Sequence, residues 1–598
     1  MKLSKLYSNF PDKFSDIHFR DGLNVVLAEI RLPENKNKDT HNLGKSLFGR
    51  MIDFCLLADR NPEFFLFKYP DLFDEFVFLL EIELFDHSYL TIRRSVHEHS
   101  KICFKKHSQR DQDYSWYTID QPEWDHAGIP LDKSKELLDS LLDLKAISPW
   151  HYRKALGYLI RSQTDYTDVY QLSKFKGKHS DWKPYLAQVL GFNGTLLEQI
   201  YKQELAISSE KTKADAFLYE LKSASKESDQ GKLDGIVLLK KREISEKTAL
   251  LNQMSFSSED VQKTNTLVDE VDTDIANLNS ERYRLMQIQK GIKKSLEDEQ
   301  ILFDPKKAKQ IFKEAGILFE GQIKKDFEQL IAFNKAISTE RRQYLSEELQ
   351  EIEAELSRVN VELQENNRQR SEILEFLNET NIFDKYKQYS DELVHLRSEV
   401  ETLERLRSGY QEYDKMQERL RTLHESQKEN FAQLEKNIAN VNSDEESRFS
   451  TIRLHFDEII KHVISRNALL NVSLNKERHP DFQADILDEK GGKTSAGEGH
   501  SYMRLLCVAF DLAVLRSHLD DQYPRFIFHD GLLEGLETRK KENLFEVVRQ
   551  YTQLGVQYII TLLDSEIPQG DAFFGKSEVI LPLHDENQDG RLFRMNSW

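Results

Sequence analysis

Prolines are almost absent from the middle of this 598-residue chain, and this gap constrains the fold more than any other feature. Of the 13 prolines, only Pro305 lies between Pro184 and Pro480. The same stretch is dominated by Glu, Lys, Gln, Leu and Arg, which are good helix formers. Because a proline breaks the interior of a helix, a stretch of this length and composition predicts long helices.

Apolar residues in this stretch repeat with the alternating three- and four-residue steps of a coiled coil. A break at Phe303–Lys307 separates two such runs. We therefore expect an antiparallel hairpin of two long helices; a parallel homodimeric coiled coil or a helical bundle is the alternative. The repeats are carried by Val268, Val271, Ile275, Leu278 and Leu285, and then by Leu345, Leu349, Ile352, Leu356, Val359 and Leu363.

The two ends of the chain mix strand and helix patterns. An antiparallel hairpin returns the chain to its starting point, so the two ends can build one α/β head between them. The expected organisation is an N-terminal half of the head at 1–195, an ascending helix at 196–299, an apex at 300–340, a descending helix at 341–445 and a C-terminal half of the head at 446–598.

Charge and composition exclude several classes of protein. With 83 basic and 102 acidic residues the net charge is −19, which does not favour general binding to nucleic acid. No apolar run reaches the ~18 residues of a membrane span, and Met1–Phe10 has no signal-peptide core, so we expect a cytoplasmic protein without a membrane partner. Cys55, Cys103 and Cys507 are too far apart in sequence to indicate a disulfide framework or a thiolate metal site. Local basic clusters occur at Lys101–His107, Lys174–His179, Lys306–Lys309 and Arg539–Lys541.

A phosphate-binding pattern lies near the N-terminus. A predicted strand and a polar loop lead into the run from Asn42 to Ser46, which opens an apolar-periodic helix. In such a cradle the first helical amides and Asn42 surround Gly44, Lys45 reaches the β- and γ-phosphates of ATP, and Ser46 ligates Mg²⁺. The match is partial, because Asp39 stands where the pattern has glycine, and a surface turn is the alternative.

Two further elements lie near the C-terminus. The apolar strand Phe526–Asp530 ends in a carboxylate, which in a phosphate-binding fold holds Mg²⁺ through water. An ordinary strand followed by an Asp-Gly turn is the alternative. The small residues around Ser495 and Gly497, followed by Glu498, allow backbone amides to approach a phosphate, although a glycine-rich hairpin exit would have the same composition.

In this order and spacing, the chain resembles the SMC and recombination-repair class of ABC-type ATPases, whose half-heads flank a folded coiled coil. Leu159–Gln163 resembles their Q-loop, so Gln163 is expected at the metal and the attacking water. The resemblance implies ATP and Mg²⁺ as cofactors, and a homodimer in which Ser495 faces the partner's nucleotide. Asn42–Ser46, Arg341 and Arg342, and the His-Asp-Gly strand end also resemble bacterial DNA-repair-like ATPases, some of them from three-component ABC-type phage-defence operons. That group implies DNA and a separate effector protein as partners.

The chain also departs from this family. Gly531 stands where a catalytic glutamate follows Asp530, so Glu534 or His529 would have to act as the base. No Cys-X-X-Cys pair is present, so the zinc hook of repair-type relatives is missing. Three functions remain open: a slow ATPase that couples DNA sensing to an effector, a non-hydrolysing scaffold locked by nucleotide, and a purely structural coiled-coil protein.

Overall fold

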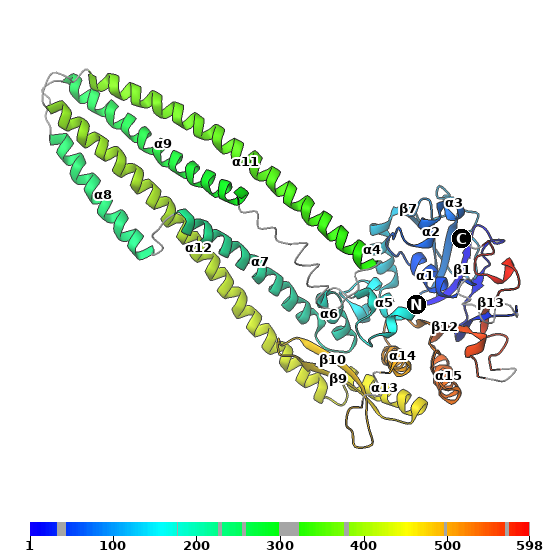
Figure 1. The fold of residues 1–598 in the computed structure, drawn as a ribbon. Coiled ribbons are helices and arrows are strands. Elements are labelled where there is room, and N and C mark those ends of the chain that lie inside the picture. Colours follow the sequence, from blue (N-terminus) through cyan, green and yellow to red (C-terminus); the bar gives the residue numbers. More distant parts are fainter. Residues whose placement is uncertain are drawn as a thin grey trace. The chain divides into compact units, whose positions relative to one another are not determined.

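The protein separates into two compact units (Figure 1). We call residues 1–205 and 425–598 the head, and residues 206–424 the arm. The computed structural model describes residues 1–32, 43–175, 178–224, 230–253, 259–297, 322–375, 382–494, 499–568 and 573–596.

The centre of the head is a five-stranded sheet in which every neighbouring pair of strands is parallel. Two strands come from the N-terminal part of the chain and three from the C-terminal part, so neither part contains the whole sheet. The central strands are nearly continuous apolar runs, as expected of parallel strands covered on both faces. In spatial order the strands are β13 (Val579–His584), β3 (Leu23–Glu29), β12 (Gln557–Leu563), β11 (Phe526–Asp530) and β8 (Ile160–Arg161).

Helix α1 (Lys45–Cys55) lies between this sheet and a second, antiparallel sheet. Its Phe48 ring lies 6.0 Å from Phe528 of β11, and its Phe54 ring lies 6.1 Å from Phe78 of the antiparallel sheet. A Cβ added at Gly49 would lie 2.4 Å from the Phe528 ring. Close packing therefore fixes α1 against β11. The antiparallel sheet has the order β2 (Ile17–His18), β1 (Lys2–Ser8), β4 (Val77–Glu83), β5 (Tyr89–Ser95), β6 (Lys101–His107) and β7 (His126–Pro130).

Helix α14 (His500–Ser517) covers the other face of the parallel sheet. Successive side chains of a strand point to opposite faces, so His529 points away from the face that Phe528 shares with α1. Asp511 of α14 contacts His529, which places α14 on that second face. The remaining elements of the head are α2 (Phe65–Lys68), α3 (Pro70–Phe73), α4 (Leu131–Leu142), α5 (Tyr152–Leu159), α6 (His179–Val189), α13 (Arg448–Ile464), α15 (Thr538–Gln553) and the hairpin of β9 (Ala468–Leu474) and β10 (Pro480–Ile486).

The helices of the arm pair in the antiparallel sense that the heptads predict. Lys240 lies 2.5 Å from Glu399, and Lys247 pairs with Glu392, so residue numbers rise along α8 as they fall along α12. Between α9 and α11, Glu353 contacts both Gln289 and Lys293. The helices are α7 (Gly194–Ala224), α8 (Gln230–Gln253), α9 (Glu259–Glu297), α11 (Gln322–Glu375) and α12 (Ile382–Ser443).

The predicted single hairpin, with ascending residues 196–299 and descending residues 341–445, is nevertheless wrong in one respect. Helices α9 and α12 run parallel, because Asp269 pairs with Arg397 and Glu281 with Arg405. The α9–α11 pair is therefore folded back along the α8–α12 pair, and the chain reverses between α8 and α9 and again between α11 and α12 (Figure 1). The predicted apex at 300–340 lies partly outside the described residues, and its described part is the start of α11.

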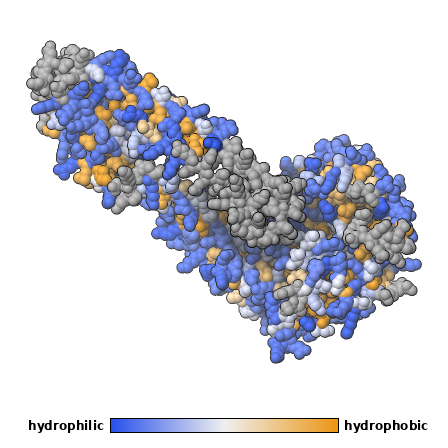
Figure 2. Space-filling view, viewed as in Figure 1, coloured by the Kyte–Doolittle hydropathy of each residue, from blue (hydrophilic) through white to orange (hydrophobic). Residues whose placement is uncertain are grey.

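A second set of contacts causes this fold-back. Leu251 of α8, Val268 of α9 and Leu393 of α12 share one apolar cluster, and Val394 of α12 joins the cluster between α9 and α11. The heptads mark the apolar faces along which the helices pair, whereas these lateral contacts bring the two pairs together. The visible surface of the arm remains mostly hydrophilic, with scattered apolar side chains (Figure 2).

Candidate nucleotide-binding site

Three of the predicted site segments leave the same edge of the parallel sheet. In register, Asp530 of β11 lies beside Thr561 of β12, which lies beside Val26 of β3, and Arg161 of β8 lies beside His529. Because the strands are parallel, the chain continues from this carboxyl edge towards α1, Gly531 and Gln163. This edge is where open α/β sheets bind their ligands.

Gly44 shapes the entry into α1. Its φ of 93° lies in the left-handed region, and a Cβ there would lie 2.6 Å from the Cβ of Leu592, so only glycine fits. Within the described residues, no side chain caps the first turn of α1 and none in that turn is acidic. The first amides of α1, with half-buried Lys45 and exposed Ser46, can therefore face an anion. Asn42 lies outside the described residues.

Asp530 ends β11 at this edge and is 3 % exposed. The hydroxyl of Thr561, on the neighbouring strand, donates a hydrogen bond to its Oδ1. That bond orients the carboxylate and suits the predicted role of Asp530 in holding Mg²⁺. Sequence reasoning did not identify Thr561, although its place near the end of an apolar strand is a detectable signal.

Gln163 packs directly against Gly531. Gly531 has a φ of 64°, and a Cβ added there would lie 2.8 Å from Gln163 Nε2 and 2.9 Å from Gln163 Cγ. The amide side chain therefore occupies the space that a larger residue at position 531 would need. The absence of a glutamate at position 531 and the position of Gln163 are therefore linked, because the Gln163 side chain fills the space beside Gly531.

Glu534 is held beside this arrangement by Arg504 of α14. Its carboxylate lies 2.6 Å from Arg504 Nη2, while Arg504 Nη1 donates to the Gly531 carbonyl at 2.9 Å. Arg504 is 5 % exposed at its side chain and Glu534 is 48 % exposed. Arg504 thus links Glu534 to Gly531, and the carboxylate of Glu534 is engaged by the guanidinium in this structure.

His529 does not have the position that a base requires. It is fully buried on the α14 side of the sheet, whereas Phe528 faces α1. Its Nε2 lies 3.1 Å from Asp511 Oδ2, and its Nδ1 lies 2.8 Å from the Tyr558 hydroxyl. Burial lowers the pKa of His529 below its ordinary value, and both ring nitrogens are engaged inside the head. We therefore withdraw His529 as a candidate base.

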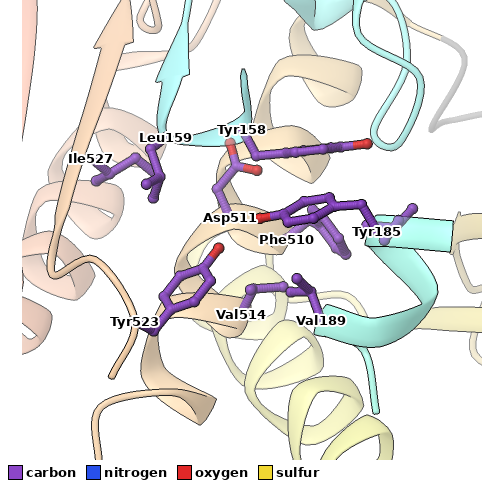
Figure 3. A pocket seen from close by; sticks show the side chains of 10 residues that line it. Tyr158, Leu159, Tyr185, Val189, Phe510, Asp511, Val514, Tyr523 and Ile527 are labelled. Carbon is purple, nitrogen blue, oxygen red and sulfur yellow. The ribbon is translucent and has the colours of Figure 1, made fainter. Parts of the chain in front are cut away.

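Asp511 is the centre of a polar cluster that sequence reasoning missed. Arg161 binds it through two hydrogen bonds, Nε to Oδ2 at 2.7 Å and Nη2 to Oδ1 at 2.8 Å. The sequence carries a signal for this pair, because Arg161 follows the apolar residues Leu159 and Ile160 and Asp511 of opposite charge lies in the apolar helix α14. Figure 3 shows Asp511 among Tyr158, Tyr185 and Tyr523, beside a cavity of about 10 Å³ that could hold at most one water molecule.

The described residues do not place the other predicted residues at this edge of the sheet. Ser495, Gly497 and Glu498 lie outside the described residues. In the basic cluster Lys101–His107, each lysine has a carboxylate partner within 3 Å, so its charge is compensated locally. Within the described ranges no group of three or more His, Cys, Asp or Glu could hold a metal ion, and no helix is long and apolar enough to cross a membrane.

Comparisons with known proteins gave one family match and several solved structures. Residues 459–597 match a family described as "Uncharacterised protein conserved in bacteria (DUF2326)". No curated protein matches the chain. The solved structures that match include Smc head domains with a coiled coil.

Three solved structures illustrate this likeness. The Smc head domain with a coiled coil and joint from Pyrococcus yayanosii is 15 % identical, covers 94 % of this chain and 92 % of its own, and gives a TM-score of 0.35. The Smc head domain with an extended coiled coil bound to the C-terminal domain of ScpA, from Pyrococcus furiosus, is 12 % identical over 95 % and 90 %, with a TM-score of 0.36. A SmcHead bound to the C-winged helix domain of ScpA is 9 % identical over 95 % and 91 %, with a TM-score of 0.31. Because these TM-scores lie below 0.5, the function of this chain has to be inferred from its own residues.

Proposed function

We propose that this protein is an SMC-like ATPase whose heads dimerise around ATP. The observation that carries the proposal is the shared edge of the parallel sheet, where the glycine-shaped start of α1, the Asp530–Thr561 pair and Gln163 leave neighbouring strands. An anion at this edge would account for Gly44 at the start of α1 and for Lys45 and Ser46 in a first turn that no side chain caps.

The residues at this edge fit ATP and Mg²⁺ chemically. Lys45 and the first amides of α1 would hold the phosphates, and Ser46, Gln163 and Asp530 would hold the metal, with Asp530 acting through water. Mg²⁺ would supply charge compensation on the transferred phosphoryl group. Glu534 remains the candidate base, on condition that Arg504 releases its carboxylate.

The wider function is a further part of the same proposal. Dimerised heads, with the element around Ser495 facing the partner's nucleotide, would couple sensing of DNA ends or foreign DNA to a separate effector protein in the cytoplasm. Anti-phage defence or DNA repair is the corresponding setting. This part rests on the resemblance of the sequence motifs, and the compensated lysines of β6 do not add to it.

A non-hydrolysing scaffold locked by nucleotide is the second candidate. Gly531, with Gln163 packed against it, favours this alternative, because no carboxylate follows Asp530. Loss of a general base costs about 10² to 10⁴ in rate, so slow hydrolysis and no hydrolysis lie close together.

Calorimetric titration with ATP and Mg²⁺ tests the proposal. Lys45→Ala should weaken ATP binding at least about tenfold, since a charged hydrogen bond contributes about 1.5–3 kcal/mol. Lys133→Ala, at an exposed lysine of α4, is the matched control and should bind as the wild type does. Equal affinity in both variants would show that Gly44–Ser46 is only a turn. Phosphate release at saturating ATP then separates the ATPase from the scaffold.

A further inference from the structure

Arg161 and Asp511 form a buried ion pair behind the nucleotide edge. Their side chains are 0 % and 2 % exposed, and both carboxylate oxygens accept from the guanidinium. Burial opposes the charge on the arginine, but Asp511 raises the pKa of Arg161 above its ordinary value. Such a bidentate pair has one preferred geometry, so it fixes β8 relative to α14.

The remaining donors of Arg161 hold the segment that begins with Gln163. Nη1 donates to the Asp165 carbonyl at 2.7 Å, and Nη2 donates to the Val169 carbonyl at 3.2 Å. These carbonyls lie within and just beyond the 3₁₀ turn η4 (Gln163–Tyr166). One guanidinium therefore ties this turn to Asp511.

Local hydrogen bonds make the same turn rigid. The Ser162 hydroxyl donates to Asp165 Oδ2 at 2.6 Å, and the Ser173 hydroxyl donates to Asp165 Oδ1 at 2.6 Å. Ser162 and Asp165 also complete a capping box around η4. The backbone of Gln163 thus has little freedom to move independently of Arg161.

The same carboxylate reaches the residue before Asp530. Because ionised Asp511 can only accept, the His529 Nε2–H is the donor, and the Tyr558 hydroxyl then donates to His529 Nδ1. Asp511 therefore joins two strand ends, the one before Gln163 and the one that carries Asp530.

We propose that the Arg161–Asp511–His529 cluster positions Gln163 relative to Asp530 and Gly531, so that Arg161 is a positioning residue for the metal and water site. The proposal deepens, and rests on, the proposed ATPase function. All three side chains are buried, so they would act through the backbone of η4 and β11. Outer residues that orient metal ligands typically contribute about 10- to 100-fold in affinity or activity.

The test compares Arg161→Lys with the wild type in the full-length protein. Lysine keeps the charge but lacks the planar fork that spans Asp511 and two carbonyls. We expect the Mg²⁺ concentration for half-maximal ATP binding to rise about 10- to 100-fold, with ATP affinity at saturating Mg²⁺ nearly unchanged. In nucleotide-free protein, hydrogen exchange at 163–169 should become faster.

Arg94→Lys is the matched control for a buried arginine. Arg94 is 0 % exposed on β5 and donates to the Phe54 carbonyl, away from η4. It should lower the melting temperature without changing the Mg²⁺ dependence. If Arg161→Lys does not fold, His529→Leu replaces it, because that variant keeps the ion pair; a smaller shift in the same direction is expected.

The outcomes separate the two claims. An unchanged Mg²⁺ dependence and unchanged exchange at 163–169, in a wild-type background that binds ATP, would overturn the positioning role and leave the ATPase proposal standing. A wild-type protein that binds no ATP would overturn the proposed function itself. Equal shifts in Arg161→Lys and Arg94→Lys would show that general loss of stability, and not position, is responsible.

Discussion

The head and the arm each bury an arginine–aspartate pair, and the two pairs are built differently. In the head, Arg161 and Asp511 share two hydrogen bonds of 2.7 and 2.8 Å. In the arm, Arg370 Nε lies 2.6 Å from Asp272 Oδ1, yet neither atom has a hydrogen-bond partner among the described residues. The head pair has one fixed geometry. In the arm pair the two atoms lie close together, but they are not aligned for a hydrogen bond.

The surroundings of the two pairs differ as well. Arg370 also pairs with the exposed Asp391, and Asp272 accepts from Ser390. Burial raises the pKa of Asp272 despite the neighbouring arginine, so its charge is poorly accommodated. These contacts join α9, α11 and α12 and thus fasten the fold-back of the arm. The comparison indicates that the buried pair of the head fixes the position of β8 and η4 relative to α14, while the pair of the arm holds α9, α11 and α12 together.

The largest expected effect comes from breaking the head pair. Asp511→Ala leaves Arg161 buried without a counter-ion and should destabilise the head by about 3–5 kcal/mol. Asp272→Ala should destabilise the arm by at most about 1 kcal/mol, because Arg370 keeps Asp391. Denaturation followed by tryptophan fluorescence reports the head, since all five tryptophans belong to that unit. The arm is followed separately by the far-UV circular dichroism of its helices, and equal losses in the two variants would remove the contrast between the pairs.

The second effect concerns the space that Gln163 occupies. Gly531→Ala should destabilise the head by about 1–3 kcal/mol and impair Mg²⁺-dependent ATP binding, because it adds a clash to a left-handed backbone. Gly555→Ala is the matched control, since Gly555 also has a positive φ, of 96°, but has nothing within 4 Å of an added Cβ. It should show only the smaller backbone cost, about 1–2 kcal/mol.

For the same reason, a carboxylate at position 531 should not restore fast hydrolysis. Gly531→Glu would have to displace Gln163 before its side chain could approach the water. Phosphate release at saturating ATP should stay at or below the wild-type rate. A clear increase would show that Gln163 yields easily and that the missing glutamate alone limits turnover.

The third effect is a nearly neutral replacement in the arm. Asp272→Leu with Arg370→Met removes both charges, and such swaps are often neutral or stabilising by about 1–4 kcal/mol. The fold-back should persist, because the apolar clusters of α9 and α12 remain. Cysteines introduced at Thr273 and Arg397, which are hydrogen-bonded across α9 and α12, should still be joined by a short cross-linker. Cysteines at Lys240 and Glu399 provide the control within the α8–α12 pair.

The smallest effect is a dependence on pH with opposite signs in the two units. Burial alone would raise the pKa of Asp165, but Lys174 and hydrogen bonds from Ser162 and Ser173 lower it overall. Its stabilising contribution is present above the ordinary aspartate value of about 3.9 and is lost as the pH falls below that value.

Asp272 behaves in the opposite way. Its raised pKa means that the folded arm binds the proton more tightly, so this residue stabilises the arm most below about pH 3.9 and less as the pH rises above it. Hydrogen exchange is measured at successive pH values and corrected for the intrinsic rate. The backbone amides of η4 should lose protection in acid, whereas the amides around Asp272 should keep theirs. Asp165→Asn and Asp272→Asn should remove the respective dependence.

Local sequence patterns were sufficient for strand β11 and for the glycine-lysine-serine helix start. The apolar run Phe526–Asp530 is β11 without change, and the predicted helix after Gly44 is α1. Such elements follow from short-range preferences, because an apolar run favours burial and glycine is the residue that most readily adopts a left-handed backbone. The heptads and the break at Phe303–Lys307 favoured an antiparallel hairpin over a parallel coiled coil, and α8 and α12 do pair in the antiparallel sense.

Contacts between distant residues decided the rest. His529 and Asp530 are neighbours in sequence, but they point to opposite faces of β11. His529 contacts Asp511 of α14, whereas Asp530 contacts Thr561 at the carboxyl edge of the sheet. Arg161 and Asp511 are 350 residues apart, and only the completed parallel sheet and its covering helix bring them together. The fold-back of the arm likewise depends on side contacts between helix pairs, which a heptad pattern does not encode. A one-dimensional pattern specifies which face of an element is buried, whereas the partner of that face depends on the three-dimensional packing of the whole chain.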